Sequence, residues 1–208
     1  MGGSIICLQE VPRWTSGKVL KGEKYVVLSS RTKGDETANR DGFDCGFLIP
    51  ASLNPKVRDE QYQKYWAGMV IAIGPSGHTI FLSMHLIHFN HFSRNPEDES
   101  GTDLIDELRE GVITFVHKCR KQYGNHIGII VGFDANVTLP ANIEGITGDS
   151  LLAPLKSHSG IMQQRVLALL QALGVRVLNT FGRAGATINE LWTCGLKRKL
   201  TANRRLII

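Results

Sequence analysis

The chain has 208 residues, a formal net charge of +5 and an isoelectric point near 9.1. This length suits one sizeable domain with a hydrophobic core and is short for two, so we predict a single domain over residues 1–208. Hydrophobic residues make up 42% of the chain, and no apolar run approaches the roughly 20 residues that a membrane span needs. The composition therefore excludes a disordered chain and a membrane-spanning helix.

Basic charge is concentrated near the C-terminus, in the stretch KRKLTANRR. This stretch holds five of the 24 Lys and Arg residues, and without them 19 basic residues face 19 acidic ones. The five are our candidate nucleic-acid-binding residues: Lys197, Arg198, Lys199, Arg204 and Arg205. A short basic run is either a solvated surface or a contact for phosphate groups, and the sequence leaves both interpretations open.

The N-terminus and the cysteines indicate an intracellular protein. The first residues, MGGSIICLQEV, lack a basic segment followed by an apolar one, as a signal peptide would have. Ile6 stands where a myristoylation motif has Ser or Thr. The four cysteines form no Cys-x-x-Cys pair, so we expect reduced thiols at Cys7, Cys45, Cys119 and Cys194. The sequence does not distinguish a nuclear from a cytoplasmic protein.

Short apolar runs, rich in β-branched residues and bounded by Gly, Pro, Asn or Asp, predict strands. They span residues 4–8, 25–29, 45–50, 68–73, 79–86, 127–133 and 175–179. The stretch GPSGH at 74–78 predicts a turn, so residues 68–86 are expected to form a hairpin.

The segment 103–123 has helical period, with acidic residues at its start and basic residues at its end, as the helix dipole favours. Its predicted buried stripe comprises Leu104, Leu108, Val112, Phe115, Val116 and Cys119. Thr102 is the expected N-cap, and Gly124 is expected to end the helix.

A second helix is predicted over residues 160–173, with Gly174 as its stop. Its apolar stripe comprises Met162, Val166, Leu169, Leu170 and Leu173. A hairpin-rich group of strands, followed by helix, strand, helix and strand, predicts an α/β domain with mixed sheets.

Polar side chains follow the predicted strand IGIIVGF, in the stretch GFDANV. Asp134 and Asn136 project to the same side if the backbone stays extended there, and Gly132 lets the backbone come close to another group. The pair can then present a carboxylate and an amide to one substrate. Asp and Asn also end strands by bonding to nearby backbone, so a turn is the alternative interpretation.

Two other predicted strands end in residues that can carry chemistry. Glu10, at the end of CLQE, is either a carboxylate ligand for Mg²⁺ or a charged residue at the sheet edge. His85, late in FLSMHL, can donate to a phosphate oxygen. The alternatives for His85 are a histidine satisfied within the core and a zinc cluster with His88 and His91.

The order of these three strand ends resembles that of the endonuclease/exonuclease/phosphatase superfamily. Its members include DNase I-like nucleases, abasic-site endonucleases, deadenylases, inositol phosphatases, sphingomyelinases and the endonuclease domains of retrotransposons. ICLQEV resembles its metal-binding Leu-Gln-Glu strand, SMHL its His-Leu strand, and GFDAN its Gly-Asp-x-Asn motif with one residue inserted before the aspartate. RVLALLQALGVRVLNTF followed by TINELWTCG resembles the helix, strand and Thr/Trp region that comes next in many members.

The resemblance implies a DNase I-like four-layered α/β sandwich that hydrolyses phosphodiester bonds with Mg²⁺ or Mn²⁺ as cofactor and nucleic acid as partner. By the same resemblance, Glu10 holds the metal and Asp134 orients or activates the attacking water. Asn136 fixes that water and the phosphate, and His85 contacts the phosphate. The chemistry is physically sensible, because a cation polarises the phosphoryl oxygen while a carboxylate aims the water.

Two parts of the family pattern are absent from the sequence. Members normally begin with a strand that ends in a metal-proximal Asn and finish with an Asp-His pair, whereas this sequence begins four residues before Ile5 and stops at RRLII. We therefore expect a fragment incomplete at both termini, for which a retrotransposon-type endonuclease domain is one source.

Loss of one member of a catalytic group commonly costs orders of magnitude in rate, so the sequence leaves several functions open. The first is a metal-dependent phosphodiesterase acting on DNA or RNA. The second is an inactive remnant that retains nucleic-acid binding. A phosphatase or sphingomyelinase of the same superfamily is a further alternative, and the oligomeric state is open.

Overall fold

The computed structural model describes residues 4–9, 25–29, 45–63, 65–73, 77–86, 100–137, 139–140, 142–148 and 160–177. The chain divides into two compact units. Unit 1 comprises Met1–His85 and Gly111–Gly132, and unit 2 comprises Leu86–Glu110 and Phe133–Ile208. A single domain over residues 1–208 stays a prediction.

Sheet A of unit 1 contains three short strands: β1 (Ile6–Leu8), β2 (Tyr25–Ser29) and β3 (Gly46–Pro50). The strand order is β1-β3-β2, and both pairings are antiparallel. Alternate side chains of β3 point to opposite faces, and Phe47 and Ile49 are fully buried. The sheet therefore presents one apolar face to a core.

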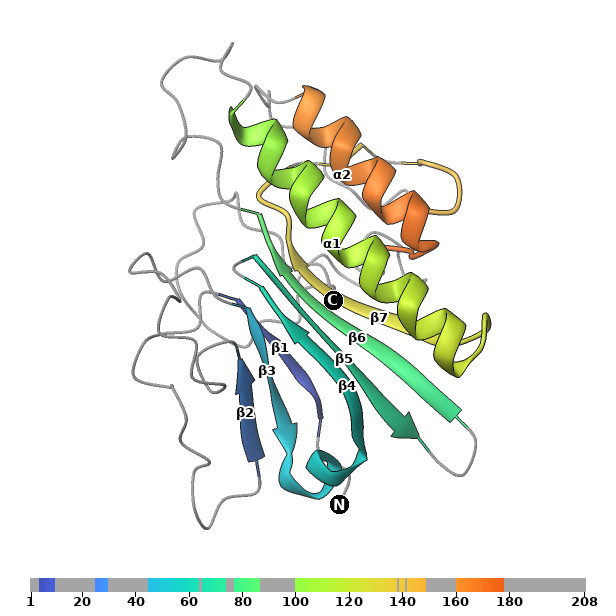
Figure 1. Ribbon diagram of the computed structural model, residues 1–208. Coiled ribbons are helices and arrows are strands. Elements are labelled where there is room, and N and C mark those ends of the chain that lie inside the picture. Colours follow the sequence, from blue (N-terminus) through green and yellow to red (C-terminus); the bar gives the residue numbers. More distant parts are fainter. Residues whose placement is uncertain are drawn as a thin grey trace, which may run out of the picture. The chain divides into compact units, whose positions relative to one another are not determined.

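Sheet B has the strand order β4-β5-β6-β7 (Figure 1). Its strands are β4 (Val57–Tyr62), β5 (Trp66–Ile73), β6 (Gly77–His85) and β7 (Gly128–Asp134). A 3-10 helix, η3 (Ala51–Lys56), leads from sheet A into β4. The pairs β4-β5 and β5-β6 are antiparallel, so the hairpin predicted over 68–86 is confirmed.

The last pair of sheet B differs in direction from the others. Figure 1 shows β6 and β7 running the same way, with helix α1 (Ser100–Tyr123) between them in the chain. Parallel neighbours need a crossover connection of this kind. The predicted α/β class with mixed sheets is thus confirmed.

The core of unit 1 lies between the two sheets. Ala67, Met69 and Ile71 of β5 face sheet A, and alternation along the strand turns Trp66 to the opposite face. On that face Trp66 meets Phe115 from the second part of α1, with 5.7 Å between the ring centroids. The described residues of unit 1 therefore form three layers: helix, sheet B and sheet A. The core cluster comprises Val26, Cys45, Phe47, Ile49, Ala67, Met69, Ile71 and Phe81.

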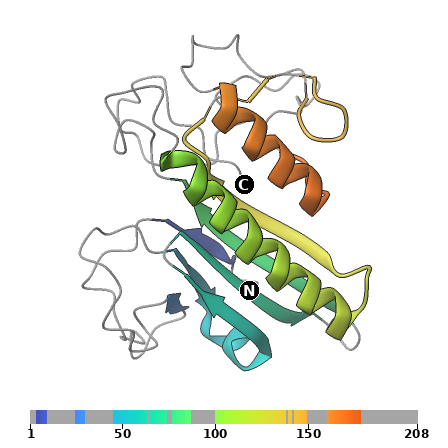
Figure 2. The same ribbon diagram turned by 45° about the horizontal axis from the view of Figure 1, so that its top comes forward.

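Unit 2 contains the first part of α1 and helix α2 (Gly160–Leu173), which lie side by side (Figures 1 and 2). Arg165 of α2 forms an ion pair with Asp106 of α1. Every residue of the predicted α2 stripe is buried, which confirms the helical period read from the sequence: Met162, Val166, Leu169, Leu170 and Leu173.

The predicted helix ends agree with the structure except at the start of α1. Gly124 and Gly174 follow their helices with positive φ values of 103° and 69°, as predicted for left-handed C-terminal glycines. The N-cap prediction for Thr102 was wrong, because α1 begins at Ser100 and Thr102 lies inside it.

The buried stripe of α1 is shifted by one residue at its start. Ile105 is fully buried, whereas Leu104, which we expected in the core, is half-buried. Ile105 continues the spacing of Leu108 and Val112 in steps of three and four, so the helical period favours it.

The sequence analysis missed one strand and predicted another that is not seen. Strand β4 was not predicted, because its sequence VRDEQY is polar and it is an edge strand of sheet B. In the expected strand 175–179, the described residues 175–177 are not in a strand. Val177 donates one backbone hydrogen bond to Ile146, at 2.8 Å. Within the described ranges, no helix is long and apolar enough to span a membrane.

Candidate functional site

The segment after β7 turns sharply at Asn136. This residue has a φ of 48°, in the left-handed region where Asn is among the few non-glycine residues commonly found. The backbone therefore does not stay extended here, so the condition under which Asp134 and Asn136 would project to the same side is not met. Asp134 and Asn136 are both half-buried, and Ala135 between them is buried.

Three hydrogen bonds hold this turn. The Leu86 N–H donates to the Asp134 backbone carbonyl at 2.8 Å, and the Asn136 N–H donates to Asp134 Oδ1 at 3.3 Å. Asn136 Nδ2 donates to the Leu86 carbonyl at 2.6 Å. In a continuing parallel ladder a backbone N–H would occupy that place, so the Asn136 side chain substitutes for it where the strand ends. The turn that one interpretation predicted is present, and a role in binding substrate stays a prediction.

His85 is the last residue of β6 and is only 2% exposed. Its backbone N–H donates to the Tyr65 carbonyl at 2.9 Å. Alternation along β6 places His85 on the same face as Ser83 and Phe81, and Phe81 belongs to the core between the sheets. His85 ends unit 1, whereas Asp134 and Asn136 belong to unit 2. The other members of the zinc alternative, at positions 88 and 91, lie outside the described residues.

Glu10 lies outside the described residues, whereas Gln9, directly before it, is among them. Gln9 Nε2 donates to Ser83 Oγ and to the Gly132 carbonyl, each at 3.2 Å. Ser83 Oγ in turn donates to the Leu8 carbonyl at 2.8 Å. Sequence reasoning assigned no role to Gln9 or Ser83, although both stand in the motifs LQE and SMHL.

Gly132 allows a close approach, as the sequence predicted. A Cβ atom built at this position would lie 2.4 Å from Cys7 Cβ and 2.8 Å from Cys7 Sγ. The Cys7 thiol donates to the Leu82 carbonyl at 3.5 Å. Burial raises the pKa of this thiol to about 11, against a smaller lowering by a backbone hydrogen bond with Gly132. Cys7 is therefore a neutral packing residue near neutral pH and not a nucleophile.

The described His, Cys, Asp and Glu side chains do not cluster as metal ligands. Among the described residues, no group of three or more His, Cys, Asp or Glu side chains is placed to hold an ion. Asp134 supplies a single carboxylate, which suits Mg²⁺, since Mg²⁺ takes one or two carboxylates and keeps several waters. A structural zinc site would need four protein ligands. The described residues do not by themselves make a complete site for either ion.

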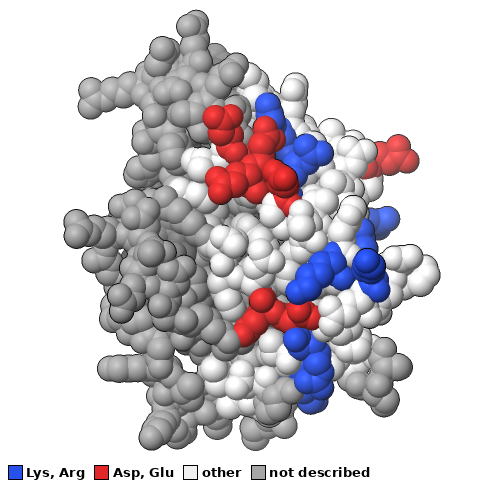
Figure 3. Space-filling view, viewed as in Figure 1, with Lys and Arg blue, Asp and Glu red and all other residues white. Residues whose placement is uncertain are grey.

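The basic residues at 197–205 also lie outside the described residues, so their contact with nucleic acid stays a prediction. On the face shown in Figure 3, a group of acidic side chains lies toward the start of α1 with basic side chains beside it, and further basic side chains lie toward the end of the helix. Along the sequence of α1, the acidic residues Asp103, Asp106, Glu107 and Glu110 precede the basic residues Lys118, Arg120 and Lys121. This is the distribution predicted from the helix dipole.

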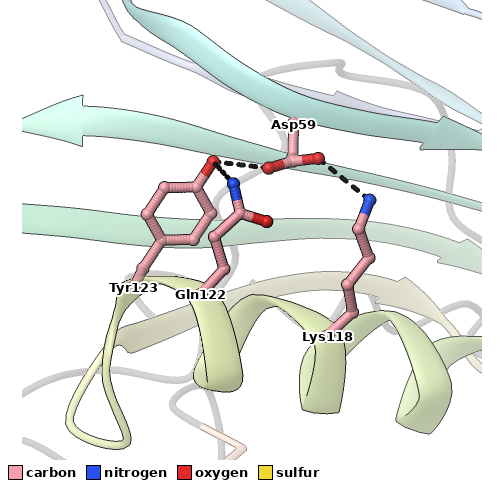
Figure 4. A network of polar contacts seen from close by, with 4 residues as sticks. All are labelled: Asp59, Lys118, Gln122 and Tyr123. Carbon is pink, nitrogen blue, oxygen red and sulfur yellow. Dashed lines mark hydrogen bonds and ion pairs between the residues drawn. The ribbon is translucent and has the colours of Figure 1, made fainter.

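A second polar cluster joins the end of α1 to β4 (Figure 4). Asp59 accepts from Lys118 Nζ at 3.0 Å through Oδ1 and from the Tyr123 hydroxyl through Oδ2. Gln122 Nε2 donates to Tyr123 Oη at 2.9 Å, and the His78 ring lies 4.5 Å from the Tyr123 ring, centroid to centroid. The cluster contains neither a sequence-predicted site residue nor a partner from the three motifs.

The titration of this cluster follows from its hydrogen bonds. Burial acts to raise the pKa of Asp59, but the hydrogen bonds from Tyr123 and Lys118 outweigh it and lower that pKa below its ordinary value of 3.8. Burial, together with the hydrogen bond to Asp59, raises the pKa of Tyr123 to about 12. The cluster therefore favours a carboxylate and a neutral phenol over a wide pH range.

Comparison with known proteins assigns no family. No protein-family model matches the chain, and no curated protein matches it in sequence. Among solved structures, the chain is similar to the endonuclease domain of TRAS1, a telomere-specific non-LTR retrotransposon. The two share 13% identity with a TM-score of 0.37, over 73% of this chain and 53% of that chain. The chain thus spans about half of that structure, and the likeness is too distant to assign a fold family or an activity.

Proposed function

We propose that the chain is part of a metal-dependent phosphodiester hydrolase that acts on nucleic acid. One observation carries the proposal: hydrogen bonds join the three motifs, which are far apart in the sequence. Gln9 of LQE bonds to Ser83 of SMHL and to Gly132 of GFDAN. Leu86 of SMHL bonds to Asp134 and Asn136 of GFDAN. A turn or a core histidine, taken singly, does not require this convergence.

The proposal takes the role of each residue from the resemblance to the endonuclease/exonuclease/phosphatase superfamily. Asp134 orients the attacking water, Asn136 fixes that water and the phosphate, and His85 donates to a phosphate oxygen. Glu10 is the proposed ligand for Mg²⁺ or Mn²⁺, and such an ion, when bound, polarises the phosphoryl oxygen.

A nicking assay on supercoiled plasmid DNA, with Mg²⁺ or Mn²⁺ and with EDTA, tests the proposal. We expect metal-dependent nicking that Asp134→Ala reduces roughly 100-fold or more, the range for loss of a positioned acid-base group. Glu10→Ala removes the proposed metal ligand and should also lower the rate by orders of magnitude. Glu107→Ala, at an exposed carboxylate on α1, is the control and should nick like the wild type. Nicking that is unchanged in Asp134→Ala, or absent in the wild type with both metals, contradicts the proposal.

A second candidate is a non-catalytic remnant that binds nucleic acid. Two observations favour this candidate. The Asn136 side-chain amide already donates a hydrogen bond to the Leu86 carbonyl, and the His85 side chain is buried. These contacts explain both residues without a substrate. Retention of labelled DNA without any nicking supports this candidate, whereas turnover of phosphoinositide or sphingomyelin without DNA cleavage assigns the chain to another branch of the superfamily.

A further inference from the structure

A closed set of hydrogen bonds ties β1 to both β6 and β7 in unit 1. The side-chain amide of Gln9 uses one N–H toward Ser83 Oγ and the other toward the Gly132 carbonyl. The Ser83 hydroxyl in turn donates a hydrogen bond to the backbone carbonyl of Leu8. Ser83 is completely buried and Gln9 is half-buried, so these polar groups depend largely on one another.

These bonds lie just before the residues to which we assign catalysis. Gln9 directly precedes Glu10, Ser83 is two residues before His85 on the same face of β6, and Gly132 is two residues before Asp134 on β7. Because side chains alternate along a strand, a two-residue step returns to the same face. Glu10, His85 and Asp134 each lie within two residues of one of these hydrogen-bonded positions. A shift of β1 against β6 or β7 at Gln9 would therefore displace the backbone next to these three residues.

We infer that Gln9 is a positioning residue, which fixes the spacing of the three strands immediately before the residues of the proposed site. The inference rests on the proposed function. Gln9 suits this task, because a primary amide has two N–H donors and can satisfy acceptors on two strands at once. Gly132 completes the arrangement, since the absence of a Cβ lets β1 approach closely enough for these bonds. Groups that orient ligands in this way typically affect metal affinity or activity by roughly 10–100-fold.

Two substitutions separate the hydrogen bonds from packing. Gln9→Glu keeps the size of the side chain but has no donor when ionised, and it places an oxygen against the Gly132 carbonyl. Gln9→Leu removes the polar group altogether. Ser83→Ala removes one of the two acceptors. Gln164→Leu, at an exposed position of α2, is the matched control.

The experiment measures kcat, KM and the Mg²⁺ concentration for half-maximal nicking of plasmid DNA, at a temperature where circular dichroism shows each variant folded. We expect Gln9→Glu and Gln9→Leu to lower kcat and raise the half-maximal Mg²⁺ concentration by roughly 10–100-fold with KM for DNA nearly unchanged. Ser83→Ala should have a smaller effect in the same direction, and combining it with Gln9→Leu should add little, because the two residues share one hydrogen bond.

The outcomes separate this inference from the proposed function. Wild-type nicking with an unchanged Mg²⁺ requirement in folded Gln9→Glu overturns the inference alone. The inference alone is also overturned if the activity lost in a variant is fully explained by the fraction of that variant that is unfolded. Absence of nicking by the wild type overturns the proposed function, and this inference with it.

Discussion

At the scale of single residues, Gly132 sets how closely β1 approaches β7. A side chain at this position would meet Cys7, with 2.4 Å between the two Cβ atoms, and Cys7 lies on a strand that cannot yield like a flexible side chain. Gly132→Ala should therefore destabilise the protein by about 1–3 kcal/mol, the usual cost of overpacking a core. Urea unfolding followed by tryptophan fluorescence measures this difference.

Gly128→Ala provides the control for this substitution. Gly128 lies on the same face of β7, but a Cβ there would lie 3.8 Å from Thr79, an ordinary contact. Alanine costs less backbone entropy than glycine on folding, so this variant should be neutral or slightly more stable. Equal stability of the two variants would show that β1 is not held against Gly132. Cys7→Gly should restore part of the loss in Gly132→Ala, because it removes the Cβ atom that the new methyl would meet.

At the scale of elements, the Asp59 cluster holds the end of α1 against β4. Tyr123→Phe removes a hydrogen bond to a carboxylate whose side chain is only 17% exposed, so we expect a loss of about 1.5 kcal/mol at neutral pH. Lys118→Met, which removes the donor to the other oxygen, should cost less, because the Lys118 side chain is 59% exposed and its pairing is screened by water. A loss in Lys118→Met as large as that in Tyr123→Phe would contradict this ranking.

The same cluster predicts a pH dependence with a definite sign. The pKa of Asp59 is lowered by folding, so its contribution is present above the ordinary value of 3.8 and is lost as the pH falls further. The pKa of Tyr123 is raised from 10.0 to about 12, so its contribution is present below pH 10 and is lost as the pH rises toward 12. The stability difference between wild type and Tyr123→Phe should therefore shrink at both extremes. A constant difference from pH 3 to pH 12 would contradict it.

Elements with a clear apolar pattern were predictable from the sequence, and elements held by polar contacts were not. The α2 stripe and the hairpin of β5 and β6 follow directly from hydrophobic spacing. Strand β4 was not predicted because an edge strand carries polar residues, and such a sequence has no hydrophobic pattern that distinguishes it from a loop. The shift from Leu104 to Ile105 was within reach of the sequence, since the spacing of Leu108 and Val112 in steps of three and four already favours Ile105.

The candidate site was predictable as a set of motifs but not as a geometry. The motifs drew attention to Asp134, Asn136 and His85, yet the bonds of Gln9 span 74 and 123 positions in the sequence. No local pattern reports a contact over such separations. Asn136 is the clearest case, because its positive φ and its bond to Leu86 depend on where β6 happens to end.

At the scale of the whole molecule, the net charge of +5 arises from a few positions. The remainder of the chain balances 19 basic against 19 acidic residues, so a neutral body carries a basic segment at 197–205. If this segment binds phosphates, the decrease in DNA affinity with rising salt concentration should arise from contacts of this segment alone. Each phosphate contact contributes roughly 0.9 to the slope of log affinity against log salt concentration for duplex DNA.

Replacing the five basic residues of this segment with Gln tests the idea against a control of equal charge. The control replaces five exposed basic residues elsewhere: Lys56, Arg58, Arg109, Lys121 and Arg176. Both variants have a net charge of zero, so long-range attraction falls alike in both. Only the first should weaken binding of a labelled duplex in fluorescence anisotropy and reduce the salt slope, by up to roughly 4–5 if every contact is lost. An equal loss in the control would mean that binding follows net charge and not position, because nonspecific attraction depends on total charge while phosphate contacts depend on where that charge lies.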